Sequence, residues 1–219
     1  MNLTIRLKTV ADLAGKCTSL ADIGTDHAYI PIYLMQKGLI SKAIAADINE
    51  GPLERADKNI RKAGLSDKIT LRLSNGLDNI NDNEAETVVI AGMGGEIISR
   101  MLEKPKPAGI KRIVLQPMTD IPLVRRKIHE NGMIITAERL AAEKDKIYTV
   151  IACEYGTCQQ FSDEDYIVSP FIKDDPIFDE YIKKQLGICK NNLEKTKNAE
   201  NKEFSAQFEY LISIYQKFI

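Results

Sequence analysis

Tryptophan is absent from this 219-residue chain, and both histidine and cysteine are scarce. The two histidines, His27 and His129, and four cysteines without a C-x-x-C pair are too few for a zinc centre. The cysteine spacing also shows no disulfide framework, which indicates free thiols in a reducing compartment. We therefore expect no metal site and a cytoplasmic protein.

Long apolar runs and an excess of charge of one sign are missing as well. No stretch approaches the roughly 18 apolar residues that a membrane span needs, and the N-terminus lacks the apolar core of a signal peptide. The formal net charge is −1, so any contact with nucleic acid depends on a local basic patch. Basic residues gather between Lys104 and Lys127, where a solvated surface and a nucleic-acid contact are both open interpretations.

Up to residue 155, short apolar runs typical of strands alternate with helical patterns, after an amphipathic helix predicted within residues 1–16. The alternation predicts βαβ units and a mainly parallel sheet covered by helices, an α/β fold. Only the charged segment AAEKDK joins the last two runs, which predicts a hairpin and one antiparallel strand near the sheet edge. The predicted strands are 18–23, 42–48, 69–73, 87–91, 111–116, 133–140 and 147–155, and the helices lie at about 27–37, 52–63, 95–103 and 121–131.

The composition changes after residue 155. Residues 156–175 carry glycine, proline and acidic clusters, a composition that predicts a linker. In the remaining tail, apolar residues recur at every third or fourth position in two segments separated by the polar stretch KTKNAENKE. This pattern predicts an antiparallel pair of helices, whose apolar stripes either bury against each other or also hold a macromolecule. We expect two domains, residues 1–158 and 159–219.

A single glycine stands where a dinucleotide-binding loop carries three. In ADIGTDHAYIP, residues 21–31, a predicted strand ends at Gly24, and Asp26 and His27 follow. A pyrophosphate needs the bare amides of G-x-G-x-x-G and would be repelled by an acid. An acid suits a cationic ligand, such as the ammonium and sulfonium groups of S-adenosylmethionine. The motif favours a methyl donor over NAD, with Asp26 as a helix cap and His27 as a packing residue left as alternatives.

Three further strand ends carry polar or glycine-rich segments that suit a nucleoside. Asp47, in AADIN, is an acid that can accept the hydroxyls of a ribose. Asn75 and Gly76 offer an amide and open backbone to an adenine edge, although an Asn-Gly pair also forms simple turns. The segment AGMGG, residues 91–95, surrounds Met93 with glycines that permit close approach of a flat ligand. The acidic, proline and aromatic signature of N6-amino DNA methyltransferases is absent there.

Taken in order, RL at 6–7, ADIGTDHAYIP, ADIN, NGL, AGMGG and LQP at 115–117 make the chain similar to the TrmK family of bacterial tRNA methyltransferases. The resemblance covers residues 1–155 closely and the helical tail in type. It implies a Rossmann-like class I methyltransferase sheet, S-adenosylmethionine as cofactor and a C-terminal coiled-coil-like helical domain. It also implies methyl transfer to N1 of adenosine 22 in tRNA.

Candidate site residues follow from the resemblance and from the motifs. Asn75 stands where the family often carries an acid, so the way in which the adenine amino group is read stays open. Our candidates for catalysis are Asp26, His27 and Met93. Our candidates for tRNA contact are Arg6, Lys8 and Pro117. The residues expected to hold the cofactor are Asp22, Gly24, His27, Asp47, Ile48, Asn75, Gly76, Gly92, Met93 and Gly94.

Adenine N1 carries a lone pair and no proton, so its methylation needs no general base, and the product is a cation. The expected work of the enzyme is orientation of the base and stabilisation of positive charge. Asp26 is the candidate for the electrostatic role, and His27 either places the base or orients Asp26. Adenosine 22 pairs within the D-stem region, so the base is expected to leave its stack.

Other functions remain open at this point. One is an S-adenosylmethionine-dependent methyltransferase of another RNA or of a small molecule, and another is a non-catalytic tRNA-binding adaptor. An NAD-dependent oxidoreductase is disfavoured because the loop lacks the required glycines and carries an acid. A monomer is the expectation for the oligomeric state.

Overall fold

The computed structural model describes residues 1–157, 159–198 and 202–219. These residues divide into two compact units, Met1–Gln159 and Gln160–Ile219. None of the described helices is long and apolar enough to cross a membrane.

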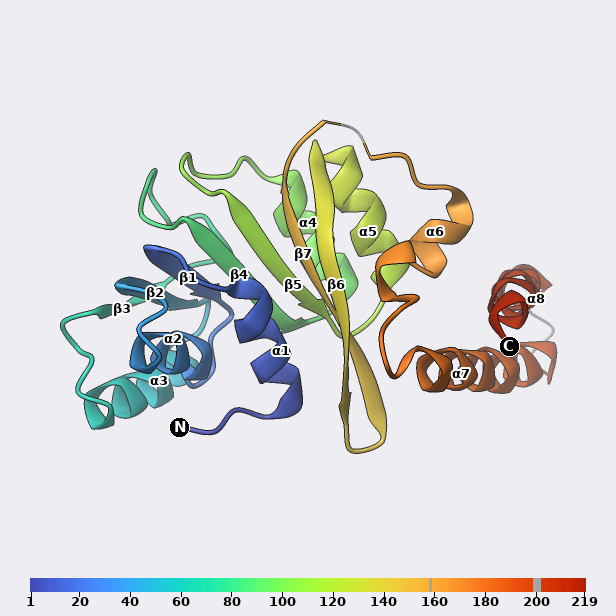
Figure 1. Ribbon diagram of the computed structural model, residues 1–219, viewed down its shortest axis with the longest axis horizontal. Helices are drawn as coiled ribbons and strands as arrows, with labels where there is room; N and C mark the ends of the chain where they lie inside the picture. Colours follow the sequence, from blue (N-terminus) through green and yellow to red (C-terminus); the bar gives the residue numbers. More distant parts are fainter. Residues whose placement is uncertain (158, 199–201) are drawn as a thin grey trace. The chain divides into compact units, whose positions relative to one another are not determined.

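The larger unit is built on a seven-stranded sheet in the order β3-β2-β1-β4-β5-β7-β6 (Figure 1). Neighbouring strands are parallel except at β7, which runs antiparallel to both β5 and β6. The predicted sheet, mainly parallel with one antiparallel strand near its edge, is confirmed. The strands are β1 (Ser19–Ile23), β2 (Lys42–Asp47), β3 (Ile69–Leu73), β4 (Thr87–Met93), β5 (Arg112–Pro117), β6 (Met133–Glu143) and β7 (Lys146–Tyr155).

The order of the strands reverses beside β1. The chain adds β2 and β3 on one side of β1 and then returns to place β4 on the other side. In an open α/β sheet, such a reversal forms a crevice beyond the carboxyl ends of the strands, where ligands bind. The ends of β1 and β4, which carry two of the motifs singled out in the sequence, therefore lie at the expected place for a ligand.

Helices cover both faces of the sheet, which explains why its central strands are apolar on both sides. Val88, Val89 and Ile90 of β4, for example, are fully buried. The helices α1, α2 and α3 lie on one face, and α4 and α5 lie on the other (Figure 1). Their bounds are α1 (Ile5–Ala14), α2 (Tyr29–Gln36), α3 (Glu50–Lys62), α4 (Gly95–Glu103) and α5 (Ile121–Glu130).

A buried ion pair joins α5 to β6. Nε of Arg125 donates to Oε1 of Glu138 at 3.0 Å, its Nη2 donates to Oε2 at 2.9 Å, and both side chains are 0% exposed. Arg125 belongs to the basic stretch between Lys104 and Lys127, for which a solvated surface was one interpretation. That interpretation is wrong for Arg125, because α5 turns this side chain toward the sheet.

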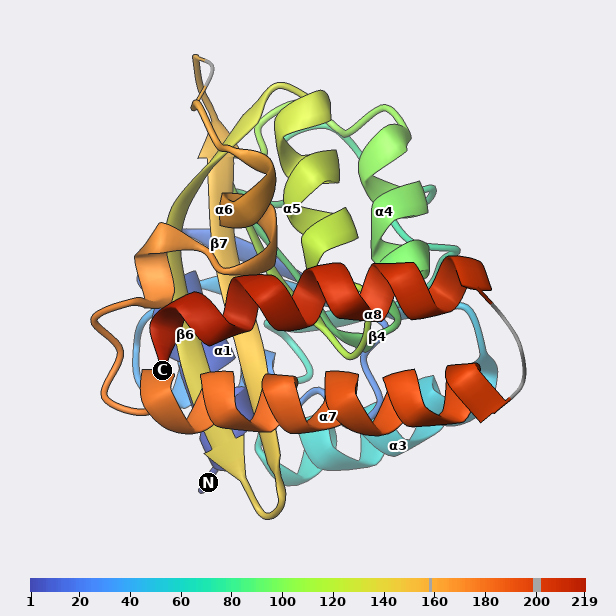
Figure 2. The same cartoon turned by 90° about the vertical axis from the view of Figure 1, so that its right-hand side faces the viewer.

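The smaller unit is helical. Its two long helices, α7 (Phe178–Asn198) and α8 (Lys202–Tyr215), lie side by side (Figure 2). Tyr181 and Ile182 of α7 and Ile214 of α8 are buried, so each helix contributes apolar residues to the interior of this unit. The predicted pair of C-terminal helices is confirmed.

The segment predicted as a linker contains a short helix, α6 (Asp163–Ile167). It begins with a capping box: Oγ of Ser162 accepts from the backbone N–H of Asp165 at 3.2 Å, and Oδ2 of Asp165 accepts from that of Ser162 at 2.9 Å. A 3₁₀ turn, Pro170–Ile172, follows. The boundary between the two units falls within the predicted linker, but part of this segment is helical, because an acidic cluster preceded by serine supplies the reciprocal bonds that begin a helix.

Candidate active site

The carboxyl ends of β1, β2, β3 and β4 gather the segments that the sequence singled out. Because these strands are parallel neighbours, the residues that follow them share one edge of the sheet. Gly24 follows β1, Asp47 ends β2, Asn75 lies just beyond β3, and Met93 ends β4. The fold thus brings motifs that are far apart in the chain to one edge.

The turn after β1 is held against β2 and covered by a side chain of β4. The backbone N–H groups of Gly24 and Thr25 both donate to the carbonyl of Ala46, at 2.8 and 2.9 Å. Gly24 has a φ of 75°, in the left-handed region that favours glycine. A Cβ atom at this position would lie 2.0 Å from Cε of Met93. The backbone angle therefore favours glycine here, and the end of the Met93 side chain lies against it.

Asp22 is a buried acid directly below this turn, with 6% of its surface exposed. The hydroxyl of Thr25 donates to Oδ2 of Asp22 at 2.7 Å and accepts from the backbone N–H of Ala28 at 3.1 Å. Burial raises the pKa of Asp22 to about 6; the Thr25 hydrogen bond opposes this shift, and the nearby charge of Asp47 adds to it. A carboxylate that is costly to ionise in isolation suits a cationic ligand, because the ligand charge would compensate its burial.

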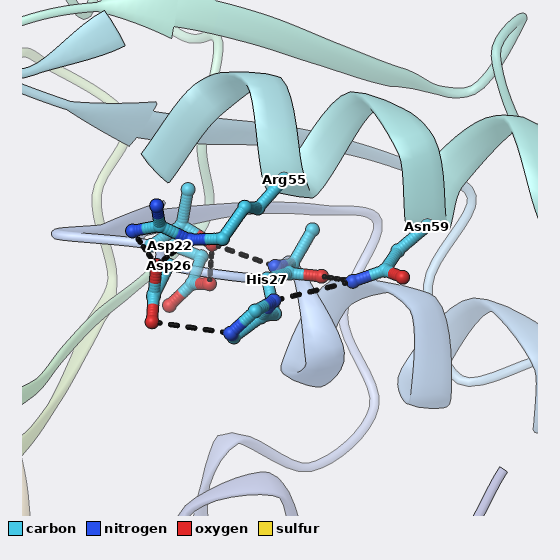
Figure 3. A network of polar contacts seen from close by, with 7 residues as sticks. Asp22, Asp26, His27, Arg55 and Asn59 are labelled. Carbon is cyan, nitrogen blue, oxygen red and sulfur yellow. Dashed lines mark hydrogen bonds and ion pairs between the residues drawn. The ribbon is translucent and has the colours of Figure 1, made fainter. Parts of the chain in front are cut away.

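Asp26 and His27 are held in a polar network that α3 completes (Figure 3). Oδ1 of Asp26 accepts from Nε of Arg55 at 2.7 Å and also from Nη2 of the same guanidinium, while Oδ2 faces Nε2 of His27 at 3.2 Å. Asn59, one turn after Arg55, donates to the His27 carbonyl at 3.0 Å. The imidazole stacks on Tyr29 with ring centroids 4.8 Å apart. Helix α3 therefore fixes both residues of the pair.

Sequence reasoning missed Arg55 and Asn59. Their only signal is the spacing of four residues, which places both side chains on one face of a helix. The alternative that Asp26 caps α2 is wrong, because the N-cap residue is Ala28 and no side chain forms the cap bond. Asp26 is also no isolated acid: its carboxylate already has a cationic partner.

Beyond β2 and β3, the structure places polar groups that suit a nucleoside. Oδ1 of Asp47 accepts from a backbone N–H two residues further on at 2.8 Å, and Ile48 is 58% exposed. Asn75 is exposed, and Gly76 follows with a φ of 65°. The buried hydroxyl of Ser74 donates to the Gly76 carbonyl at 2.8 Å. The Asn-Gly turn is thus fixed by its own loop, with the Asn75 side chain left at the surface.

The glycines of AGMGG shape the end of β4. The register with β5 shifts where Gly92 has a φ of 81°. Gly94 is the N-cap residue of α4, and a Cβ atom on Gly95 would lie 2.4 Å from the carbonyl oxygen of Thr119. These contacts explain the glycines locally, and they leave Met93 at the edge of the sheet.

The three candidates for tRNA contact have different surroundings. Lys8 is exposed on α1 and forms an ion pair with Asp12, with Nζ and Oδ1 2.6 Å apart. Pro117 is buried as the last residue of β5. Nη1 of Arg6 donates to Oε1 of the fully buried Gln116 at 2.6 Å. Of the three side chains, that of Arg6 reaches the edge that carries the other candidate residues.

The basic stretch between Lys104 and Lys127 is largely matched by acids. Exposed ion pairs contribute little to stability, but each one cancels a positive charge. This stretch therefore offers little net charge to attract nucleic acid. Its ion pairs are Lys104–Asp78, Lys111–Glu86, Arg112–Glu154, Arg125–Glu138 and Lys127 with both Glu103 and Glu130.

The metal-binding and thiol side chains of the described residues do not gather into one cluster. Among the residues described, no group of three or more His, Cys, Asp and Glu side chains is placed to hold a metal ion. Cys17, Cys153 and Cys189 are free thiols, whereas Cys158 lies outside the described residues. Burial raises the pKa of Cys153 to about 12, so this thiol stays protonated and unreactive. What the edge presents is carboxylates and amides.

The strand order, the single-glycine turn over a buried acid and the second acid at the end of β2 define a Rossmann-like methyltransferase domain. Residues 3–151 match the family described as "Methyltransferase domain". The chain is 37% identical over 158 residues to the tRNA (adenine(22)-N(1))-methyltransferase of Bacillus subtilis, an alignment that covers 71% of this chain and 66% of that enzyme. It belongs to the TrmK family.

Solved structures of this family superpose along the whole chain. Bacillus subtilis TrmK, an m1A22 tRNA methyltransferase, has a TM-score of 0.87 at 29% identity and covers 100% of this chain and 99% of its own. Sp1610 of Streptococcus pneumoniae, in complex with S-adenosyl-L-methionine, has a TM-score of 0.88 at 32% identity, with 99% of both chains covered. TrmK of M. capricolum, in complex with S-adenosyl-homocysteine, has a TM-score of 0.84 at 27% identity over 99% of both chains.

Proposed function

We propose that this protein transfers a methyl group from S-adenosylmethionine to N1 of adenosine 22 in tRNA. The observation that carries the proposal is the buried Asp22 beneath the Gly24 turn at the switch point of the sheet, which suits a cation and not a pyrophosphate. The activity named for the Bacillus subtilis relative supports the same reaction. Because its proposed substrate is tRNA, the protein is expected to act in the cytoplasm.

S-adenosylmethionine, when bound, supplies the methyl group as a sulfonium. The residues present fit this ligand, since Asp22 offers a buried negative charge to an ammonium. Asp47 offers a carboxylate to the ribose hydroxyls, and the exposed Ile48 offers an apolar surface to the adenine ring. The remaining residues that we assign to the cofactor are His27, Asn75, Gly76, Gly92, Met93 and Gly94.

We assign two tasks to the protein: it orients the target base, and it stabilises the positive charge that develops on that base. The unprotonated N1 of adenine needs no base, so Asp26, His27 and Met93 act by placing the base and by stabilising the positive charge that it acquires. The contact between Asp26 and Arg55 lowers the net charge of the pair, but it fixes the carboxylate in one position. We assign catalysis to residues 1–158 and tRNA binding partly to the coiled-coil-like helical domain, residues 159–219. Arg6 and Lys8 are further candidate tRNA contacts, whereas the side chain of Pro117 is buried and is not placed to be one. The protein acts as a monomer in this scheme.

Mapping the modified nucleotide tests the proposed function. The protein is incubated with S-adenosylmethionine and unmodified tRNA, and the tRNA is then analysed by nuclease digestion and mass spectrometry. We expect 1-methyladenosine at position 22. Methylation only of another RNA or of a small molecule would support a broader methyltransferase, and tRNA binding without any methyl transfer would support an adaptor.

Replacing Asp26 with alanine is expected to lower the single-turnover rate of methyl transfer about 10- to 100-fold, because the variant loses the fixed carboxylate that faces the developing positive charge. The rate is measured with saturating S-adenosylmethionine and tRNA. Asp57→Ala is the matched control, since Asp57 is a carboxylate of α3 that pairs with Arg61 at 2.7 Å. Equal rates for Asp26→Ala and the control would remove Asp26 from the mechanism.

A further inference from the structure

Arg6 is a half-buried cation at the end of the sheet where β4 to β7 meet α1. Its Nη1 donates to Oε1 of Gln116 on β5 at 2.6 Å and lies 3.7 Å from where a Cβ atom of Gly92 would be. The guanidinium lies over the ring of Tyr148 on β7, 5.5 Å from its centroid. Its backbone N–H donates to Oε2 of Glu143 on β6 at 3.2 Å. Three strands beside α1 therefore fix where this charge lies.

The guanidinium of Arg6 forms no ion pair with any carboxylate of the described residues. Glu143 binds the backbone of Arg6, and its pKa is lowered first by a hydrogen bond from Thr4 and, to a smaller extent, by the backbone bond and the charge of Arg6. Lys8 and Arg55, by contrast, each have an aspartate partner. A charge removed from water is costly unless an opposite charge meets it. The fixed position and the absence of an ion pair to the guanidinium together point to an anionic ligand.

An oxyanion fits this position better than the target base does. Methylation gives the adenine a positive charge, so a guanidinium against the base would oppose the reaction. Guanidinium groups bind carboxylates and phosphates through paired N–H donors, and stacking on Tyr148 holds the plane of the donors. We propose that Arg6, braced by Gln116 and Tyr148, binds an oxyanion beside the site of methyl transfer. The proposal rests on the proposed function, which supplies two such groups: a phosphodiester of tRNA and the carboxylate of the methyl donor.

Two binding measurements distinguish these sources. The first is the affinity for tRNA across a series of salt concentrations, in which each phosphate contact contributes about 0.9 to the slope of log K against log salt. The second is the affinity for S-adenosylmethionine by calorimetry without tRNA. Arg6→Gln is expected either to reduce the tRNA slope by about one, if the ligand is a phosphodiester, or to weaken S-adenosylmethionine binding about 10- to 100-fold, if it is the carboxylate.

Gln116→Glu is the second variant, and it keeps Arg6 in place. The new carboxylate would lie at the position of Oε1, 2.6 Å from Nη1, and would supply the counter-charge from within the protein. It is expected to reproduce the loss seen with Arg6→Gln. Arg61→Gln, on the exposed Arg61–Asp57 pair, is the control for removal of one positive charge and is expected to change neither measurement.

Lower thermal stability of both variants with an unchanged tRNA slope and unchanged S-adenosylmethionine affinity would overturn the proposal, because Arg6 would then only fasten α1 to the sheet. If the wild type bound neither tRNA nor S-adenosylmethionine, the proposed function itself would be contradicted. Since both measurements report binding, the site is tested independently of where the methyl group is placed.

Discussion

An Asp22→Asn variant is expected to bind S-adenosylmethionine at least about 100-fold more weakly than the wild type at pH 8, and yet to unfold at a higher temperature. The first effect follows because a buried charge that loses its partner costs about 3–5 kcal/mol, and Asp22 is the buried acid assigned to the ligand ammonium. The second follows because asparagine removes a carboxylate that is ionised at this pH without a cation in the free protein.

The pH dependence of stability follows from the pKa of Asp22. This pKa is about 6 in the folded protein, whereas an unperturbed aspartate, as in the unfolded chain, has a pKa of 3.8. The folded state thus holds the proton more tightly, so the stability of the wild type falls as pH rises from about 4 to 6. Above pH 6, the ionised Asp22 lowers the free energy of unfolding by about 3 kcal/mol in total. This value is the upper limit for the stability that Asp22→Asn can gain.

Calorimetry and thermal unfolding at pH 5 and pH 8 check this prediction. The wild type should bind S-adenosylmethionine more tightly at pH 8, where Asp22 is ionised, and the stability gain of the variant should shrink at pH 5. Asp57→Asn, an exposed carboxylate on α3, should change neither affinity nor its pH dependence. An affinity of Asp22→Asn equal to that of the wild type at pH 8 would contradict the role of this carboxylate.

Glu138→Ala is expected to lower the free energy of unfolding by about 3–5 kcal/mol, because it leaves the guanidinium of Arg125 buried without its carboxylate. The measurement is urea-induced unfolding of the variant and the wild type. Glu154→Ala is the matched control: Glu154 pairs with Arg112 on the same sheet at 2.7 Å, but both side chains are more than one third exposed, so its loss should cost less than about 1 kcal/mol.

A double replacement tests whether the ion pair itself stabilises the fold or whether only an unpaired buried charge destabilises it. Arg125→Met combined with Glu138→Leu removes both charges and keeps apolar volume, and it should recover much of the stability that Glu138→Ala loses. A loss below about 1 kcal/mol for Glu138→Ala would show that the guanidinium finds other partners and that the pair is dispensable.

The sheet was predictable because its central strands are buried on both faces and therefore appear in the sequence as short, nearly continuous apolar runs. The run predicted at 18–23 contains β1, for example, in which all residues are buried. The convergence of Gly24, Asp47 and Met93 was predictable for a related reason, since the carboxyl ends of parallel strands share one edge. Both inferences depend only on local pattern and on the rules of sheet topology.

The partners of the site residues were not predictable in this way. Arg55 reaches Asp26 only because α3 packs beside the turn after β1, and no local pattern specifies that packing. The pair of Arg125 and Glu138 was missed for a different reason: Arg125 lies in a stretch of basic residues typical of a surface. An available signal was Glu138 itself, which stands among the inward-facing apolar positions of β6.

The contact between Gly24 and Met93 has an evolutionary consequence. With Cε of Met93 2.0 Å from the position of a Cβ atom, a side chain at position 24 would require only that the end of Met93 turn away. Methionine is unbranched and turns about several bonds, so it can adapt to such a change where an isoleucine could not. The left-handed backbone angle at position 24, more than the methionine, should therefore keep this glycine among relatives, while position 93 is free to vary in length.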